Sequence, residues 1–405
     1  MDQIKLNRRY TRQYSAIQGS YWMSTCASVS YVSVYLLDRG YSNSEIGVII
    51  AISNILAVIL QPLVASFTDR HKKLELRKLL SGFSGSMILM AGVLVFITTD
   101  SMLLSILMVY IATITMVIQP LMNSLSMAYE KSGIFVNYGF ARGIGSIAYA
   151  ALSTSLGLLL RHFTTILIPI CICMTAIAFT VFVYFFKDCT KNASHSDANL
   201  AIGGGEQQEK ASSLHEFVKK NPRFILLLLG VFFIFYNHQT LSVFTIQVIE
   251  GFGGTSREMG IANSIAAMSE FPAMFMVNRL LKKYNCRTLI RFAAITFAVK
   301  HLIILSATSV PVFFIAQVFQ IGSYAILIPV SVTYVSKLLK KVDAVKGQAF
   351  MTSAITLSSV FASMINGRLL DVTSVHNVIL IGTIVAWIGS IIVFFSVERV
   401  EDEIT

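Results

Sequence analysis

The chain has 405 residues, of which 55% are hydrophobic and only 13% charged, and its mean hydropathy is +0.69. A soluble domain carries about 25% charged residues, so this composition excludes an ordinary soluble globular protein and indicates a polytopic membrane protein. The net charge of +11 does not predict nucleic-acid binding, because the basic residues lie in short segments between apolar runs.

Twelve apolar runs are each long enough to cross a bilayer, which takes about 20 residues in a helix. No small-residue cleavage site follows the polar, basic residues 1–12, so we expect an uncleaved first helix and not a signal peptide. The chain is therefore predicted to be an all-α membrane protein with twelve transmembrane helices. The runs lie near residues 14–37, 44–67, 77–99, 102–126, 136–160, 163–186, 223–249, 256–278, 288–308, 310–336, 347–370 and 377–397.

Lysine and arginine are distributed unevenly between the connecting segments. With both termini placed in the cytoplasm, 26 of the 32 basic residues lie on the inner side and four on the outer side. A bias of this kind sets the orientation of membrane helices. We therefore expect a multi-pass protein of the cell membrane with both termini cytoplasmic.

One long polar segment, residues 187–222, divides the chain into a six-helix half at 1–186 and a second at 223–405. It contains the flexible sequence Gly203-Gly204-Gly205 and a short amphipathic stretch at 214–220. A basic segment follows the second run of each half. A duplicated, pseudo-symmetric arrangement of this type predicts a transporter whose halves rock about a central site.

The stretch from Tyr138 to Tyr149 places an arginine, Arg142, about one turn inside an apolar segment. A cation at membrane depth is costly and is usually paired and turned toward a cavity. Residues three and four apart share a helix face, which predicts a small, polar and aromatic face suited to a ligand path. Its members are Arg142, Gly145, Ser146, Tyr149 and Ser153. The alternative is an arginine at the membrane edge that extends to the lipid headgroups.

Two further charges, Glu270 and Lys300, lie within apolar runs of the C-terminal half. Burying charges for stability alone is unfavourable, so we expect these two to neutralise each other as an ion pair that also serves transport. A purely structural pair is the alternative.

Two segments resemble motifs of the major facilitator superfamily, and the resemblance to its oligosaccharide:proton symporters, typified by lactose permease, covers essentially the whole chain. In the loop expected after the second helix, residues 65–70 (Ala-Ser-Phe-Thr-Asp-Arg) are similar to the G-x-x-x-D-R signature, with Ala65 replacing the glycine. The resemblance implies that Asp69 and Arg70 form a cytoplasmic conformational latch. Residues 138–142 are similar to the Y/F-G-x-A-R motif of helix 5.

The resemblance also implies functional roles. Arg142 would bind the sugar, with Tyr149 stacked on its ring, and Glu270 would link sugar binding to proton movement. Lys300 resembles the family's helix 9 arginine. The acidic partner of Arg142 would fall near Ser126, so Glu130, one turn further, is the nearest carboxylate. Its alternative place is a cytoplasmic loop.

The sequence departs from the family pattern at two helices. On helix 10, Gln320 and Ser323 stand where a histidine and a proton-carrying glutamate are expected, and neither titrates in the useful range. With Gln317 they are expected to form a polar stripe. On helix 7, Asn237 replaces an acidic residue beside Tyr236. We expect Gln320, Tyr236 and Asn237 to contact substrate.

Proton coupling is therefore expected to use Glu270, with His238 or His301, although a lone membrane histidine is more often a packing residue. Without the helix 10 carboxylate, facilitated diffusion stays open.

The sequence thus predicts a monomeric secondary transporter that takes up a small polar solute, most consistent with proton-coupled sugar or oligosaccharide uptake. Transport of small aromatic acids or nucleosides, multidrug-type export and a non-transporting membrane sensor are the alternatives. The sequence contains no nucleophile–base constellation, metal-ligand spacing or phosphate-binding glycine loop. We therefore expect neither an enzyme nor a cofactor.

Overall fold

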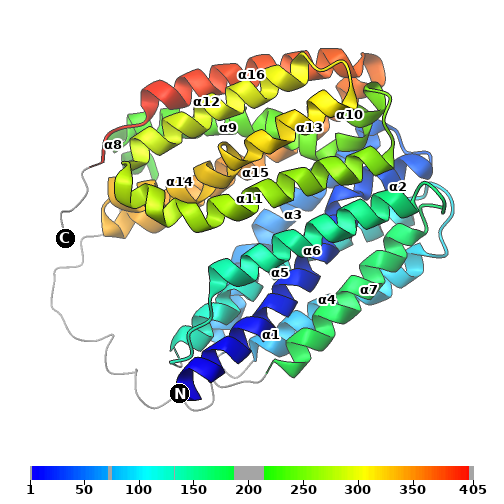
Figure 1. Cartoon of the computed structure of the whole chain (residues 1–405), viewed down its shortest axis with the longest axis horizontal. Coiled ribbons are helices and arrows are strands. Elements are labelled where there is room, and N and C mark those ends of the chain that lie inside the picture. Colours follow the sequence, from blue (N-terminus) through cyan, green and yellow to red (C-terminus); the bar gives the residue numbers. More distant parts are fainter. Residues whose placement is uncertain (1, 72–74, 132, 187–213, 401–405) are drawn as a thin grey trace. The chain divides into compact units, whose positions relative to one another are not determined.

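The computed structural model describes residues 2–71, 75–131, 133–186 and 214–400. All regular secondary structure in these residues is helical, as predicted (Figure 1). The N-terminal elements are α1 (Asp2–Thr25), the π-helical turn η1 (Cys26–Ser30), α2 (Val32–Asp38), α3 (Asn43–Arg70), α4 (Leu76–Leu94), α5 (Met102–Lys131), α6 (Tyr138–Leu159) and α7 (Leu167–Phe185).

The C-terminal elements begin with a short helix, α8 (Leu214–Lys220), at the predicted amphipathic stretch. They continue with α9 (Pro222–Val243), α10 (Thr245–Gly251), α11 (Ser256–Lys283), α12 (Cys286–Leu305), α13 (Val310–Val318), the 3₁₀ turn η3 (Phe319–Ile321), α14 (Tyr324–Leu338), α15 (Lys341–Val372) and α16 (Val375–Ser396). Each predicted apolar run therefore coincides with helical structure.

Eight helical stretches of the described chain are long and apolar enough to cross a membrane. Four predicted runs are not among these eight stretches. They are the runs near 14–37, 77–99, 136–160 and 256–278, which lie on α1 to α2, α4, α6 and α11. These helices contain charged residues, such as Arg142 in α6 and Glu270 in α11, which lower their hydropathy. The charges that lower the hydropathy of α6 and α11 include those that the sequence singled out as functional.

The helices form two compact units, which are described separately. Unit 1 comprises Met1–Gly40, Ile55–Ser153 and Phe163–Gln208, and unit 2 comprises Tyr41–Asn54, Thr154–His162 and Glu209–Thr405. The first turns of α3 and the end of α6 thus belong with the C-terminal helices.

In unit 2, the start of α3 is joined to the end of α15 by a carboxylate. Asp371 accepts hydrogen bonds from the backbone nitrogens of Asn43 and Ser44, at 3.0 and 2.8 Å. Gly47 brings the two backbones together, because a Cβ atom there would lie 2.1 Å from the carbonyl oxygen of Ser363. Asp371 therefore satisfies backbone donors at the start of α3 that have no partner within that helix.

Small residues also allow close packing in the centre of unit 2. A Cβ atom at Gly389 of α16 would lie 2.7 Å from the carbonyl oxygen of Gly230 on α9. Close backbone approach at glycine is a common basis of helix packing in membranes. At one end of α9, Phe217 of α8 is fully buried and stacks on Phe350, with ring centroids 5.3 Å apart.

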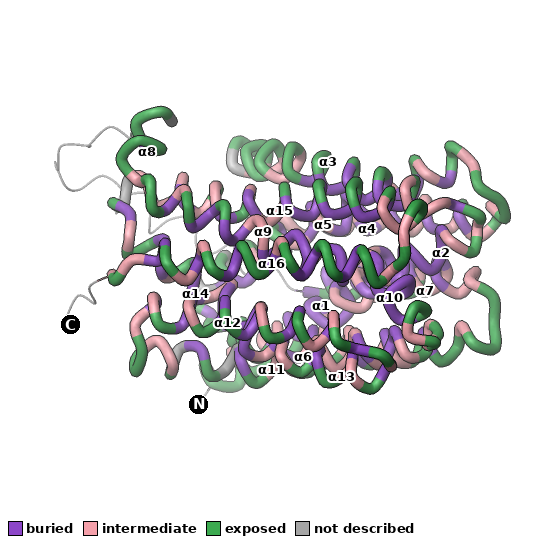
Figure 2. Tube along the Cα trace, turned by 90° about the horizontal axis from the view of Figure 1, so that it is seen from above, coloured by how far each residue is buried: buried purple, intermediate pink, exposed green. Residues whose placement is uncertain are grey.

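The outward face of α16 is apolar and exposed (Figure 2). Soluble proteins rarely expose a continuous apolar face of this kind, whereas helices in a bilayer present one to lipid. The face consists of Ile381, Ile384, Trp387, Ile388, Ile391 and Phe395.

Candidate functional site

Arg142, the arginine predicted to bind substrate, lies against an aromatic ring within unit 1. Its guanidinium carbon is 3.8 Å from the ring centroid of Trp22, and its Nη1 atom donates a hydrogen bond of 2.8 Å to the Ser146 hydroxyl. A guanidinium over an indole face is a favourable cation–π contact. α1 and α6 thus hold the charge in place while leaving the side chain partly exposed.

Gly145 makes this contact possible. A Cβ atom at this position would lie 2.5 Å from Cδ1 of Trp22, a distance that side chains do not adopt. The glycine three residues after Arg142 therefore gives the indole room to lie flat against α6, beneath the guanidinium.

The position of Trp22 is set by a chain of hydrogen bonds. Its Nε1 atom donates to Gln18 Oε1 at 3.0 Å, and Gln18 Nε2 donates to the Tyr14 hydroxyl at 2.9 Å. Tyr14 in turn donates to the carbonyl oxygen of Met122 on α5, at 3.1 Å. Sequence reasoning missed Trp22. The four-residue spacing of Gln18 and Trp22 on α1 places them on one helix face, but the sequence does not show that this face meets Arg142.

Tyr149 lies further along the same face of α6 and forms a hydrogen bond of 2.7 Å with the Ser30 hydroxyl. Tyr31 donates to the carbonyl oxygen of Ser153 at 2.6 Å. The predicted polar face of α6 therefore contacts α1, η1 and the residue that follows η1. Its far end joins α6 to η1, and the substrate contacts predicted for Arg142 and Tyr149 stay predictions.

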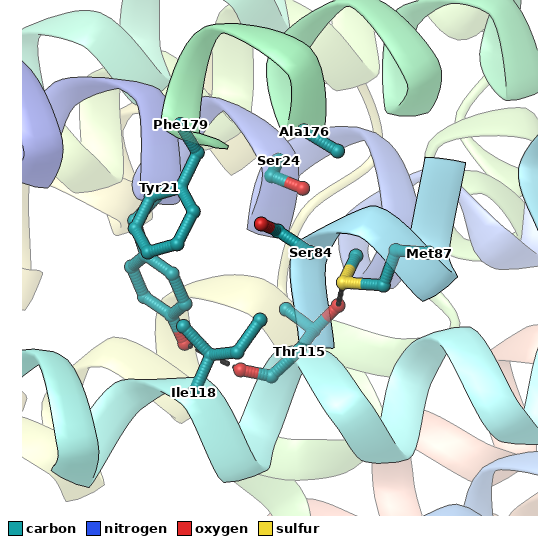
Figure 3. Close-up of a pocket in the computed structure, with 8 residues that line it drawn as sticks. All are labelled: Tyr21, Ser24, Ser84, Met87, Thr115, Ile118, Ala176 and Phe179. Atoms are coloured by element: carbon teal, nitrogen blue, oxygen red, sulfur yellow. Dashed lines mark hydrogen bonds between the residues drawn. The ribbon is translucent and has the colours of Figure 1, made fainter. Parts of the chain in front are cut away.

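A small cavity lies elsewhere in unit 1, between α1, α4, α5 and α7 (Figure 3). Its volume is about 10 Å³, which is close to the minimum for a single water molecule. Among the described residues, the buried Ser24 hydroxyl at this cavity has no hydrogen-bond partner. The cavity is too small for a transported solute.

In unit 2, the two charges predicted to pair are joined through an amide. Lys300 Nζ donates to Gln320 Oε1 at 2.6 Å, and Gln320 Nε2 donates to Glu270 Oε1 at 3.1 Å. Lys300 is 2% exposed and Gln320 is 5% exposed. α12, η3 and α11 thus place an ammonium, an amide and a carboxylate in one line.

The predicted polar stripe at 317, 320 and 323 spans an interruption of the helix. α13 ends at Val318, η3 spans 319–321, and α14 begins at Tyr324. A Cβ atom at Gly322 would lie 2.9 Å from Cγ2 of Thr296, which is one turn before Lys300. The glycine lets the break approach α12 closely, so that Gln320 reaches Lys300. Short 3₁₀ segments inside long helices often mark functional hinges.

The two candidate histidines lie in an aromatic cluster. His238 stacks on Tyr324 with ring centroids 5.2 Å apart and meets Phe297 edge-on. His301 is fully buried, its ring is 5.9 Å from that of Phe297, and neither ring nitrogen has a hydrogen-bond partner among the described residues. Both rings contact aromatic side chains, as packing residues do.

Tyr236 and Asn237 serve helix packing in the described structure. The Tyr236 hydroxyl donates to Asn366 Oδ1 at 3.1 Å, and Asn366 Nδ2 donates to Thr240 at 2.6 Å. Asn237 is 1% exposed and abuts Gly382 of α16, where a Cβ atom would lie 2.1 Å from its Oδ1 atom. Asn366 of α15, which the sequence reasoning missed, is fully buried.

The latch motif at 65–70 lies in the last turns of α3 and not in a loop, so that expectation is corrected. Thr68 Oγ1 donates back to the carbonyl oxygen of Ala65 at 2.7 Å, and Arg70 is exposed. The side chains of Asp69 and Glu130 lie outside the part that the structure describes. The roles predicted for these two carboxylates stay predictions.

No group of three His, Cys, Asp or Glu residues within the described ranges is arranged to hold a metal ion.

Comparison with known proteins gives consistent results. The model of the MFS_1 like family matches residues 20–381. The maltose permease of Geobacillus stearothermophilus is 26% identical over 384 residues, which cover 91% of this chain and 90% of that protein.

Two solved structures are similar in fold. A mutant of the nucleoside transporter NupG superposes with a TM-score of 0.79 at 12% identity, over 96% of this chain and 100% of that one. A bacterial homologue of the human lysosomal transporter Spinster, in an inward-facing and unoccupied conformation, gives a TM-score of 0.68 at 13% identity, over 96% and 97%.

Proposed function

Since the chain belongs to the MFS_1 like family and is therefore a membrane transporter, we propose that it takes up a sugar or oligosaccharide together with protons. The curated relative named a maltose permease supports the substrate class. The observation that supports the coupling proposal is the hydrogen-bonded line from the buried Lys300 through Gln320 to the partly buried Glu270.

The proposal that the substrate is a sugar rests on Arg142 and Trp22. A guanidinium offers a rigid fork of hydrogen-bond donors, which matches adjacent hydroxyl groups as well as a carboxylate. The indole beneath it adds a flat apolar surface against which a sugar ring can stack. Side chains of this kind suit a hydroxylated ring, and both come from elements of unit 1.

The proposal that uptake is coupled to protons rests on Glu270. An ionised Glu270 is attracted to the Lys300 ammonium. The Gln320 amide links the two charges, because it donates a hydrogen bond to Glu270 and accepts one from Lys300. A proton on Glu270 removes the negative charge and weakens the line. Protonation and the packing of α11 against α12 and η3 are thereby linked, as a proton-coupled conformational change requires.

The test is labelled maltose uptake by the purified full-length protein in liposomes with an inside-alkaline pH gradient. We expect accumulation in the wild type. Glu270→Gln should lose accumulation but retain exchange of labelled for unlabelled maltose, because binding persists while the titratable group is gone. Glu258→Gln, on the same helix, is the matched control: Glu258 caps the start of α11 through Thr255 and lies 4.0 Å from Arg257 Nε, away from Lys300 and Gln320 in the chain, so accumulation should persist.

Competing solutes decide the substrate class. Uridine and an aromatic acid are added in excess during maltose uptake. Inhibition by maltose analogues alone supports the sugar assignment. Inhibition by uridine in place of sugars would contradict it and favour a nucleoside, the substrate named for the structural neighbour NupG. Accumulation that survives Glu270→Gln would contradict the coupling role.

A further inference from the structure

A pocket lies where four helices of unit 2 begin or end. Its volume is about 500 Å³, within the range of small-ligand sites. α9 and α12 begin there, and α14 and α16 end there, at one end of the unit (Figure 1). The lining residues are Arg223, Arg287, Leu338, Phe395, Val397, Glu398 and Arg399.

The charge of this pocket is strongly positive, with three arginines and one carboxylate among its lining residues. Glu398 pairs with Arg223, with 3.0 Å between Oε1 and Nη1, and so neutralises one of the three. The Nε atom of Arg287 is buried and has no hydrogen-bond partner in the described part of the chain. The rest of the Arg287 side chain is only partly buried, and the Glu398 carboxylate is paired with Arg223, so the lining of the pocket keeps an excess of positive charge that attracts anions.

The orientation of the helices adds to this charge. Arg223 and Arg287 are each the second residue of a long helix, α9 and α12. The positive end of the helix dipole and the free backbone N–H groups of a first turn both favour anions. Arginine forks placed beside two such ends suit a phosphate group, which offers several acceptor oxygens.

The other wall of the pocket is apolar and faces outward. Phe395 is 74% exposed and continues the exposed apolar face of α16, and Leu338 and Val397 add apolar surface to the lining. Hydrocarbon chains can run along this wall while a polar headgroup stays among the arginines. The pocket thus combines an anion site with an acyl-chain surface.

We propose that this pocket binds the phosphate group of an anionic phospholipid of the inner leaflet, with the acyl chains lying along Phe395 and α16. The distribution of lysine and arginine places this end of the helices on the cytoplasmic side, where anionic lipids attract basic pockets. The site uses no residue of the proposed transport pathway, so it stands independently of the substrate.

The test is the thermal stability of the full-length protein in micelles titrated with phosphatidylglycerol, phosphatidylcholine or sodium phosphate. Phosphatidylglycerol should raise Tm more than phosphatidylcholine does. The double variant Arg287→Gln/Arg399→Gln should bind phosphatidylglycerol about 10- to 30-fold more weakly, since each basic residue contributes about 1 kcal/mol. Lys282→Gln/Lys283→Gln, which removes the same charge from the nearby end of α11, should bind normally.

The outcomes separate three cases. A loss specific to the arginine variant supports the lipid site. An equal loss in the lysine variant, or none in either, would overturn it and leave only general attraction between basic residues and lipid. Stabilisation by sodium phosphate alone, lost in the arginine variant, would overturn the lipid assignment in favour of a soluble phosphate.

The variant Arg287→Lys tests whether weaker phosphatidylglycerol binding results from misfolding. It keeps the charge but loses the planar fork, so it should fold normally and still bind several-fold more weakly. Unchanged affinity in Arg287→Lys would contradict recognition by the fork.

Discussion

At the scale of single residues, the two charged centres are held by neutral neighbours. The Arg142 guanidinium lies over the Trp22 ring and donates a hydrogen bond to Ser146. The Lys300 ammonium donates a hydrogen bond to the Gln320 amide. A neutral partner holds a charge in position without removing it. The proposed roles of Arg142 and Lys300 both depend on these charges being retained.

Gly145→Ala should displace Trp22 from beneath Arg142. The added methyl group would lie 2.5 Å from the indole, and such overpacking costs about 1–3 kcal/mol. We expect reduced maltose affinity and altered Trp22 fluorescence, measured in a Trp387→Phe background so that Trp22 is the only reporter.

The matched control is Gly85→Ala on α4, where nothing lies within 4 Å of an added Cβ atom. It should leave fluorescence and uptake unchanged and gain up to about 1 kcal/mol from helix propensity. Unaltered Trp22 fluorescence in Gly145→Ala would refute the steric argument.

Gln320→Leu should leave the Lys300 ammonium without its acceptor. Hydrogen bonds to charged groups contribute about 1.5–3 kcal/mol, so we expect a lower Tm in detergent and loss of gradient-driven accumulation. Gln317→Leu, the same change at a neighbouring residue of the same segment, should have a smaller effect on both. Equal effects of the two substitutions would indicate that the Lys300–Gln320 bond contributes nothing particular.

At the scale of elements, breaks in the helices set the contacts of predicted site residues. The 3₁₀ turn η3 brings Gln320 to Lys300, and the π-helical turn η1 ends at Ser30, the partner of Tyr149. An unbroken helix from 310 to 338 would present its side chains in a different register. The breaks therefore determine which partners Gln320 and Tyr149 meet.

Asp371→Asn should loosen the start of α3. The substitution removes the charge that accepts bonds from Asn43 and Ser44, and loss of a helix cap costs about 0.5–2 kcal/mol. We expect faster hydrogen exchange of the amides at 43–46, with little change at the start of α11.

Glu258→Gln provides the reciprocal control, since Glu258 caps α11 together with Thr255. Its effect should appear at 255–258 and spare 43–46. Unchanged exchange at 43–46 in Asp371→Asn would show that the cap across unit 2 is not needed.

At the scale of the whole molecule, the distribution of basic residues predicts the sidedness of the chain. Single cysteines at Asp100 and Lys283, introduced after replacing the five native cysteines, test it with a membrane-impermeant maleimide. Asp100→Cys should react in intact cells and Lys283→Cys only after permeabilisation. The reverse pattern would invert the proposed topology, and with it the leaflet assigned to the phosphate pocket.

The sequence was sufficient to predict the helical class, the position of each helical run and the family resemblance. Hydropathy and charge bias act segment by segment, because the bilayer requires about 20 apolar residues per helix whatever the neighbours are. The short amphipathic helix α8 was also predicted from local sequence, because its apolar and charged residues alternate within a single segment.

The partners of the candidate site residues were decided only by the tertiary structure. Nothing local in the chain shows that Trp22 lies under Arg142, that Gln320 joins Lys300 to Glu270, or that Asp371 caps α3. These contacts join residues far apart in sequence. They depend on helix breaks and on glycines that set how closely two backbones approach, and a periodic pattern carries no information about either.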